Sequence, residues 1–477
     1  MPRSAALFPV AVLLVCALAA GDAGARGSAG ATGAGDPYFP AAGNGGYDVL
    51  HYGLTLGYEP GVRRLVGEAE IEARAEQDLS AFSLDLQGMR VGSVEVAGRA
   101  ARFHRGGGGG HELVVRPRAA VRKGAGFTVV VRYSGLPEVV RDPDGSEEGW
   151  LVTEDGALAL GEPVGARAWF PGNHHPADKA AYDITVAVPA GLQAVSNGEL
   201  RGRTREGGRD VFRWHVGEPM ASYVATVAVG KFAVRRSRTG DGLPVYVAVD
   251  PGQVAASAEV LGRIPEVVAW GERTFGPYPF SSAGAIVVGE GDAEYALETQ
   301  NRPVFPGAPG LELLVHEVAH QWFGNSVTPE SWRDMWLNEG FATYAEWLWA
   351  EEHGGDSAQE VFDLLYAGDY FEKKADGDAV WAFPPGRPPN AARISGSPVY
   401  ERGAMVLHRI REETGDEVFR GILRGWAAVH RHGNADTDDF TAYVERKAPG
   451  VDFSRIWADW LYGEGRPAAV PAEKETP

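Results

Sequence analysis

Three residues of the segment H-E-V-A-H, namely His316, Glu317 and His320, have the types and the spacing to bind a metal ion and to use it. Positions i and i+4 of a helix lie on one face, so the two imidazoles can converge on one metal. Glu317 lies beside these ligands without being one, so it is free to accept a proton from metal-bound water. Catalytic zinc sites often add one carboxylate and keep a position open for water. Glu339, nineteen residues after His320, can supply that carboxylate.

The flanking residues favour a buried helix around this motif. L-E-L-L-V precedes it, Q-W-F-G follows it, and Gly324 would end the helix. The alternative without a function is a pair of surface histidines on a polar helix, and it would require no particular residues beside the motif. A chain with 12 histidines would contain H-E-x-x-H by chance only about 0.02 times. The motif therefore indicates a metal site that holds one zinc ion per chain.

The elements that must position this site begin after a long β-rich stretch. From residue 47 to about 232, short alternating runs such as E-A-E-I-E-A-R-A and F-T-V-V-V-R-Y are separated by turn residues. They predict an all-β domain with a saddle-like or sandwich arrangement over residues 46–235. Five consecutive glycines, 106–110, indicate a hairpin loop, because a phosphate-binding loop requires a strand-to-helix context.

A second domain of mixed helices and strands is predicted over residues 236–465. The pattern favours a helix over about 255–275 and a strand over 285–288. A helix over about 335–352 would carry Glu339 and end before Gly354. Another would begin near Glu401 and end at Gly415.

Length and charge agree with a multidomain globular protein. The 477 residues are too many for one core, and the hydrophobic fraction of 44% is that of a folded protein. A formal net charge of −19 argues against nucleic acid and anionic membranes as partners.

The first 25 residues have a basic residue, an apolar run and small residues at the end, which is typical of a signal peptide. We therefore expect a secreted, extracellular protein. Anchoring as a lipoprotein through Cys16 is disfavoured by the preceding Val15. No other apolar stretch approaches the length of a membrane span, so stable membrane insertion is not expected. Residues 26–45 and 466–477 are predicted to be a flexible lead-in and a flexible tail.

Several segments together resemble the M1 family of zinc aminopeptidases, in the gluzincin group. H-E-V-A-H-Q-W-F-G-N and W-L-N-E-G-F-A match its metal-binding motifs. Residues 295–299, Y-A-L-E-T, lie where the family has its G-x-M-E-N exopeptidase signature, and V-Y-E-R-G-A is similar to its Y-x-K-G-A segment, with Arg402 in place of lysine. E-P-V-G-A-R-A-W-F-P-G-N also matches, and the resemblance runs from about residue 47 to 460.

This resemblance implies a thermolysin-like α+β zinc-metallopeptidase domain after the β domain. It also implies a short form of the family, without the helical C-terminal domain of longer members. His316, His320 and Glu339 would hold the zinc and Glu317 would be the general base. Tyr400 would stabilise the oxyanion that forms during peptide hydrolysis.

The resemblance further implies peptide substrates with a free N-terminus. A carboxylate beside the zinc would bind the α-ammonium group, and Glu298 is the residue at that position. Glu162 matches a second acidic position of the same pocket, and Ala296 and Leu297 would line the first specificity pocket. The signature segment has lost its glycine and its asparagine, at Tyr295 and Thr299.

Two pairs of polar residues have weaker interpretations. His174 and His175 have no neighbours with ligand spacing, so surface or loop histidines are expected. Asn338 and Thr343 flank Glu339 and could hydrogen-bond the ligands.

Two other functions stay open from the sequence. An endopeptidase could use the same metal site, and a catalytically silent relative could serve as a binding module. Retention of both metal motifs and of Tyr400 argues against the second. The oligomeric state is open, with a monomer as the simplest state.

Overall fold

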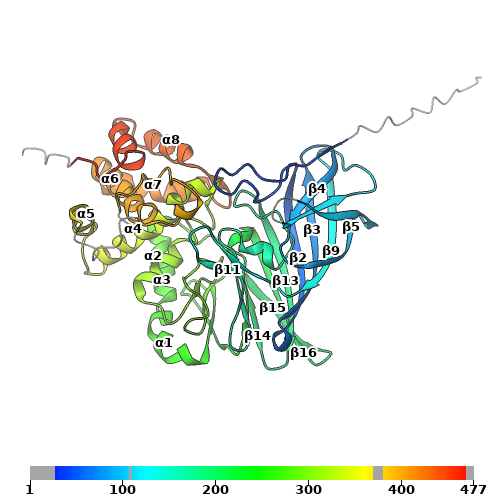
Figure 1. Cartoon of the computed structure of the whole chain (residues 1–477). Coiled ribbons are helices and arrows are strands. Elements are labelled where there is room, and N and C mark those ends of the chain that lie inside the picture. The colour runs from blue at the N-terminus through cyan, green and yellow to red at the C-terminus, as the bar shows by residue number, and fades with distance from the viewer. Residues whose placement is uncertain (1–26, 107–109, 369–379, 469–477) are drawn as a thin grey trace, which may run out of the picture.

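The computed structural model of the protein describes residues 27–106, 110–368 and 380–468. The long strands lie on one side of the molecule and the labelled helices on the other (Figure 1). The predicted signal peptide with Cys16, most of the glycine run and residues 469–477 of the predicted tail lie outside the described residues. None of the helices in the described ranges has the length and apolar content needed to span a bilayer.

An eight-stranded sheet forms the body of the N-terminal half, with the strand order β15-β16-β13-β2-β3-β9-β5-β6. In β3, alternate residues such as Leu65, Ala69 and Ile71 are buried, while Glu70 and Glu72 are exposed, so one face of the sheet covers the core. The strands are β2 (Tyr47–Glu59), β3 (Arg64–Ala75), β5 (Arg90–Val96), β6 (Arg99–Ala100), β9 (Gly126–Gly135), β13 (Lys179–Pro189), β15 (Glu199–Glu206) and β16 (Arg209–Ala221).

Two smaller sheets complete this half and confirm that it is β-rich. One has the order β1-β4-β8-β7 and the other β10-β11-β12-β17-β14. Their strands are β1 (Ser28–Ala29), β4 (Leu79–Asp85), β7 (Arg102–Gly106), β8 (Glu112–Arg116), β10 (Val139–Arg141), β11 (Glu147–Val152), β12 (Ala157–Leu160), β14 (Gln193–Ser196) and β17 (Val227–Gly230).

The C-terminal half combines a small sheet with helices, as predicted for an α+β domain. Its sheet has the order β18-β19-β20-β21, and β22 pairs with β23. The sheet begins at Ala233, so the predicted boundary at residue 235 falls inside β18. The strands are β18 (Ala233–Arg238), β19 (Pro244–Val249), β20 (Ala283–Val287), β21 (Val304–Phe305), β22 (Thr328–Pro329) and β23 (Asn434–Ala435).

Eight α-helices are described in this half: α1 (Val254–Gly262), α2 (Ile264–Phe275), α3 (Leu311–Ala319), α4 (Trp336–Glu352), α5 (Ala358–Ala367), α6 (Gly403–Thr414), α7 (Asp416–Val429) and α8 (Thr437–Lys447). The single helix predicted over 255–275 is wrong, because α1 ends before Arg263 and α2 begins after it. Pro265 lacks the N–H that would continue α1, but it fits the first turn of a new helix.

The predicted flexible lead-in is wrong from Gly27 onward, because this segment is tied to both halves. Ser28–Ala29 pairs with β4 in the N-terminal half. Asp36 is buried and accepts hydrogen bonds from the N–H groups of Tyr38 and Phe39 and from the N–H of Trp332 in the C-terminal half. A buried carboxylate needs such donors, so Asp36 fixes this segment to the C-terminal half as well as to the N-terminal half.

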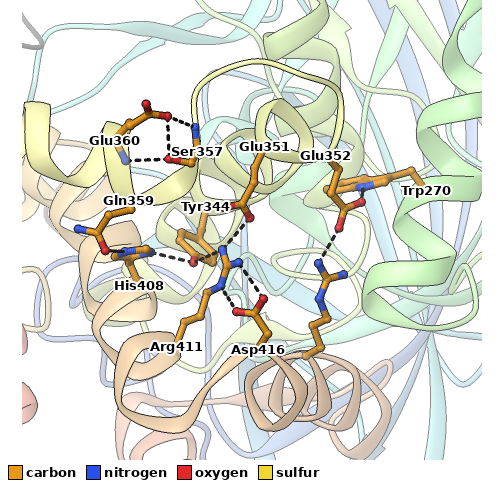
Figure 2. Close-up of polar contacts among 11 residues, drawn as sticks. Trp270, Tyr344, Glu351, Glu352, Ser357, Gln359, Glu360, His408, Arg411 and Asp416 are labelled. Carbon is orange, nitrogen blue, oxygen red and sulfur yellow. Dashed lines mark hydrogen bonds and ion pairs between the residues drawn. The ribbon is translucent and has the colours of Figure 1, made fainter.

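Ion pairs hold α4 against its neighbours (Figure 2). Arg411 of α6 donates to Glu351 of α4 at 2.8 Å and to Asp416 of α7 at 2.7 Å. Glu352, the last residue of α4, accepts a hydrogen bond from Trp270 of α2 at 2.8 Å. These contacts fix the C-terminal end of the helix that carries Glu339.

Candidate metal centre and active site

Helices α3 and α4 bring His316, His320 and Glu339 together. The Nε2 atom of His316 lies 3.2 Å from Oε2 of Glu339, and Nε2 of His320 lies 3.3 Å from the same oxygen. All three side chains are buried, and their possible ligand atoms lie within 4.8 Å of one another. The structure therefore brings the three predicted ligands to one point.

The donor set fits zinc. Nδ1 of His316 donates to the carboxylate of Glu346, and Nδ1 of His320 donates to the main-chain oxygen of Phe323 at 3.0 Å. Both rings thus direct Nε2 toward Glu339, and two imidazole nitrogens with one carboxylate are the ligands of many catalytic zinc sites. Burial lowers the pKa of His316, but Glu339 and Glu346 raise it well above its usual value. The cluster thus favours a positive charge, which Zn²⁺ would supply.

Glu317 lies next to His316 in the sequence and lines a cavity together with the three ligands. It is buried, and its Oε2 has no hydrogen-bond partner within the described part of the chain. Burial raises the pKa of Glu317 to about 8, although His316 and His320 lower it. A metal ion bound beside it would lower this pKa again, and the ionised carboxylate could then accept a proton from a reacting group.

Tyr400 lies beside His316, in the turn of π-helix Pro398–Arg402 that leads into α6. Its ring is nearly parallel to the His316 imidazole, with 6.1 Å between centroids and 14° between planes. Burial and Glu339 raise the pKa of Tyr400 well above its usual value, so its hydroxyl keeps its proton and can donate.

Two glycines allow this approach. A Cβ atom on Gly340 of α4 would lie 2.9 Å from the carbonyl carbon of Gly403 at the start of α6, too close for any side chain. The two helices therefore cross with backbones in contact, which brings the turn with Tyr400 to the metal ligands. Arg402 is buried and fixes this turn by donating to the main-chain oxygens of Trp460 and Asp459, both at 2.9 Å.

Three carboxylates gather at the same site. Oxygen atoms of Glu162, Glu298 and Glu339 lie within 4.8 Å of one another. Glu298 is only 3% exposed, and its Oε1 has no hydrogen-bond partner among the described residues. Burial raises the pKa of Glu298, although His320 lowers it. Buried carboxylates this close to one another favour a cation between them.

The predicted contribution of Leu297 is wrong, whereas Ala296 lines the cavity. Leu297 is buried, and its main chain exchanges hydrogen bonds of 2.9 and 2.8 Å with Val304. In an extended chain, side chains alternate between two sides. Ala296 and Glu298 therefore face the cavity, and Leu297 between them faces the protein core.

The cavity has a volume of about 450 Å³ and includes residues that sequence reasoning missed. Asp142, Asp144, Tyr295 and Glu346 all line it. Glu346 follows Glu339 by seven residues, so the helical period could have placed both on one face. Asp142 and Asp144 lie in a loop far away in the sequence, and no local pattern connects them to the metal motif.

The weaker predictions for polar residues have mixed outcomes. His174 and His175 lie in the loop before β13, which is one of the two expected settings, but they are buried rather than at the surface. The Nε2 atom of His174 contacts the main-chain oxygen of Phe170 at 3.0 Å, and Nε2 of His175 lies 3.5 Å from Asp36. The Asn338 amide donates to the Tyr223 hydroxyl at 3.4 Å instead of to a metal ligand.

Comparison with known proteins agrees with this geometry. The model of the peptidase M1 N-terminal domain matches residues 49–224, and that of the peptidase family M1 domain matches residues 308–460. Aminopeptidase M1 of Arabidopsis thaliana is 28% identical over 73% of this chain and 41% of its own length. Leucyl aminopeptidase of Saccharolobus solfataricus is 26% identical over 82% of this chain and 51% of its own length.

Solved structures match over a larger share of their length. An M1 zinc metallopeptidase of Deinococcus radiodurans is 29% identical, with a TM-score of 0.83 over 93% of this chain and 100% of that chain. A variant of it bound to the substrate Tyr-Ser-Ala gives the same TM-score of 0.83 at 28% identity, over 92% and 100% of the two chains. The present chain spans about half or less of the two curated aminopeptidases, at 41% and 51%. Because both domain models match in their expected order around this site, the chain belongs to peptidase family M1.

Proposed function

We propose that the protein is a zinc-dependent aminopeptidase that removes the first residue of peptides with a free N-terminus. The observation that carries this proposal is the position of Glu298 and Glu162 beside Glu339. An α-ammonium group has a pKa near 8 and is mostly charged at neutral pH. Bound between Glu298 and Glu162, it would place the first peptide bond at the metal centre and leave no room for further residues before it.

His316, His320 and Glu339 would hold the zinc ion. When bound, zinc lowers the pKa of water and polarises a carbonyl group. Glu317, whose Oε2 has no hydrogen-bond partner among the described residues, accepts a proton from the attacking water and returns it to the leaving amine. Tyr400 donates a hydrogen bond to the carbonyl oxygen as negative charge develops there, which contributes about 2–4 kcal/mol to stabilising the transition state.

The relatives support this function over a silent binding module. The two curated relatives compared above are named as aminopeptidases, and the solved relative is a zinc metallopeptidase, a variant of which is bound to the substrate Tyr-Ser-Ala. All five residues of the metal site and its chemistry, Glu317 and Tyr400 included, are present in this chain. An endopeptidase would need an open cavity beyond the metal on the side where Glu298 and Glu162 lie.

Export from the cell is part of the proposal, because residues 1–25 have the composition of a signal peptide. Expression of the full chain in a secreting bacterium, followed by N-terminal sequencing of the protein in the medium, tests it. A protein found only in the cells with Met1 retained would contradict export.

The activity is tested with aminoacyl-anilides beside their N-acetylated twins, with and without a zinc chelator. Cleavage of the free-amine substrates alone, abolished by chelator and restored by zinc, is the expected result. Cleavage of acetylated peptides at internal bonds would indicate an endopeptidase. Lack of any cleavage with zinc bound would indicate a binding module.

A further inference from the structure

One wall of the active-site cavity is an acidic loop that the proposed chemistry does not use. Asp142 and Asp144 line the cavity from the loop between β10 and β11. The loop is closed on itself by a hydrogen bond of 3.0 Å from the Asp142 N–H to the Ser146 oxygen. It is joined to the segment before Glu298 by the Glu147 N–H, which donates to Glu294 at 3.2 Å. These hydrogen bonds hold the loop in place as part of the site.

The carboxylate of Asp142 has unmet bonding capacity. Its Oδ1 is buried and has no hydrogen-bond partner among the described residues. Glu148, which is wholly buried, lies next to it; its Oε1 accepts the Val164 N–H at 3.2 Å, and its Oε2 has no partner in the same ranges. Burial raises the pKa of Asp142 to about 7. A cation that pairs with Asp142 would offset the free energy that burial of its carboxylate costs.

The loop lies on the side of the cavity where the first residue of a substrate must sit. Glu148, which follows the loop, accepts the N–H of Val164, two residues beyond Glu162, so the loop lies against the segment that carries Glu162. Glu162 and the acidic wall line the same cavity. The side chain of the first residue branches from the carbon that carries the ammonium group, so a long side chain can reach the wall that Asp142 lines.

The charge balance of the cavity favours a further cation. Seven of its lining side chains are acidic, and none of those described is lysine or arginine. Zinc and the α-ammonium group together supply three positive charges. Arg167 lowers the pKa of Asp142 but does not line the cavity. A neutral side chain would bury Asp142 without pairing it.

We propose that this cavity selects peptides whose first residue is arginine or lysine, and that Asp142 pairs with the positive end of that side chain. The inference rests on the proposed aminopeptidase function and names its substrate class. Asp144, exposed at the cavity mouth, adds negative charge on the same side. Asp142 touches the substrate but takes no part in bond cleavage.

The test compares arginine with citrulline, which has nearly the same shape but no charge. We expect the wild-type kcat/KM for arginyl-anilide to exceed that for citrullyl-anilide by about ten- to hundredfold. Asp142→Asn should bring the arginine value down to the citrulline value and leave leucyl-anilide within about twofold. Glu154→Gln, an equal charge change at an exposed position after β11, should change none of these values.

Binding of free L-arginine and L-citrulline to the zinc-loaded protein, measured by calorimetry, separates this inference from the proposed function. A preference for arginine that Asp142→Asn abolishes supports the inference even if no anilide is cleaved. The inference would be overturned if the wild type bound L-arginine and L-citrulline equally and cleaved their two anilides equally. A wild-type preference for arginine that Asp142→Asn retains at an unchanged melting temperature would overturn it too.

Discussion

Glu346 accepts a hydrogen bond from Nδ1 of His316, while Nε2 of the same ring lies 3.2 Å from Glu339. The two glutamates are seven residues apart on α4 and face the same imidazole from one side of the helix. One helix therefore supplies both a metal ligand and the group that orients a second ligand. A carboxylate on the far nitrogen fixes the tautomer and makes the imidazole a stronger ligand.

Replacement of Glu346 should weaken zinc binding without removing a ligand. Glu346→Gln is expected to lower zinc affinity by about ten- to hundredfold, because the His316 ring loses its charged acceptor. Competition with a chromogenic chelator measures the affinity. Glu351 lies about one and a half turns further along α4 and accepts a hydrogen bond from Arg411 rather than from a metal ligand. Glu351→Gln is therefore the matched control. Equal zinc affinity in the two variants would contradict the role of Glu346.

Loss of the Glu317 carboxylate should separate metal binding from catalysis. Glu317→Gln keeps the size of the side chain and all three ligands, so zinc content should stay near one per chain. Turnover is expected to fall by about 10²–10⁴-fold, because the amide cannot accept the proton. Metal analysis and anilide kinetics on the same sample check both parts. Near-normal turnover would assign the base to another residue.

Sequence reasoning succeeded where one helix period or one compact motif carried the information. His316 and His320 were predictable because residues four apart share a helix face, and the order of the two domains followed from a change of hydrophobic period. Ala296 and Leu297 were treated alike because the sequence does not show the pairing with Val304 that turns one of them away. A motif match gives positions, but the direction of a side chain depends on the neighbouring strand.

Long-range partners were beyond sequence reasoning. Asp36 lay in a segment rich in glycine and alanine, whose composition is typical of a flexible leader. Its partners, the N–H groups of Phe39 and Trp332, include one that is 296 residues away. His174 and His175 were expected in a loop or at the surface, and their burial could not be foreseen because Asp85 and Asp36, which they contact, lie far away in the sequence. Asp142 reaches the cavity only through the docking of its loop.

Removal of the Tyr400 hydroxyl should affect turnover more than binding. Tyr400→Phe keeps the ring that lies parallel to His316 but removes the donor to the developing oxyanion. We expect kcat to fall by about 10²–10³-fold, with KM within a few-fold of wild type, because the hydrogen bond strengthens only in the transition state. Steady-state kinetics on one good substrate distinguish the two effects. A rise in KM at constant kcat would instead make Tyr400 a ground-state binding group.

Asp36 should make the stability of the protein depend on pH in the acid range. Burial alone would raise its pKa, but hydrogen bonds from His175 and from the N–H groups of Phe39 and Trp332 lower it to about 2. An aspartate in an unfolded chain has a pKa of about 3.9. Because the pKa is lower in the folded state, the stabilisation is present above about pH 4 and is lost as the pH falls from about 4 to about 2. The difference amounts to about 2–3 kcal/mol.

Asp36→Asn should remove this dependence. At pH 7 the variant is expected to have a free energy of unfolding about 2–3 kcal/mol below that of wild type, and the gap should narrow as the pH falls through 4. Urea denaturation at several pH values between 3 and 7 measures it, and the comparison between variants cancels the loss of metal in acid. Asp241→Asn, exposed on the turn between β18 and β19, is the control and should follow wild type. A gap between Asp36→Asn and wild type that stays constant down to pH 3 would show that Asp36 is not ionised in the folded protein, and the segment would then be held by its other contacts.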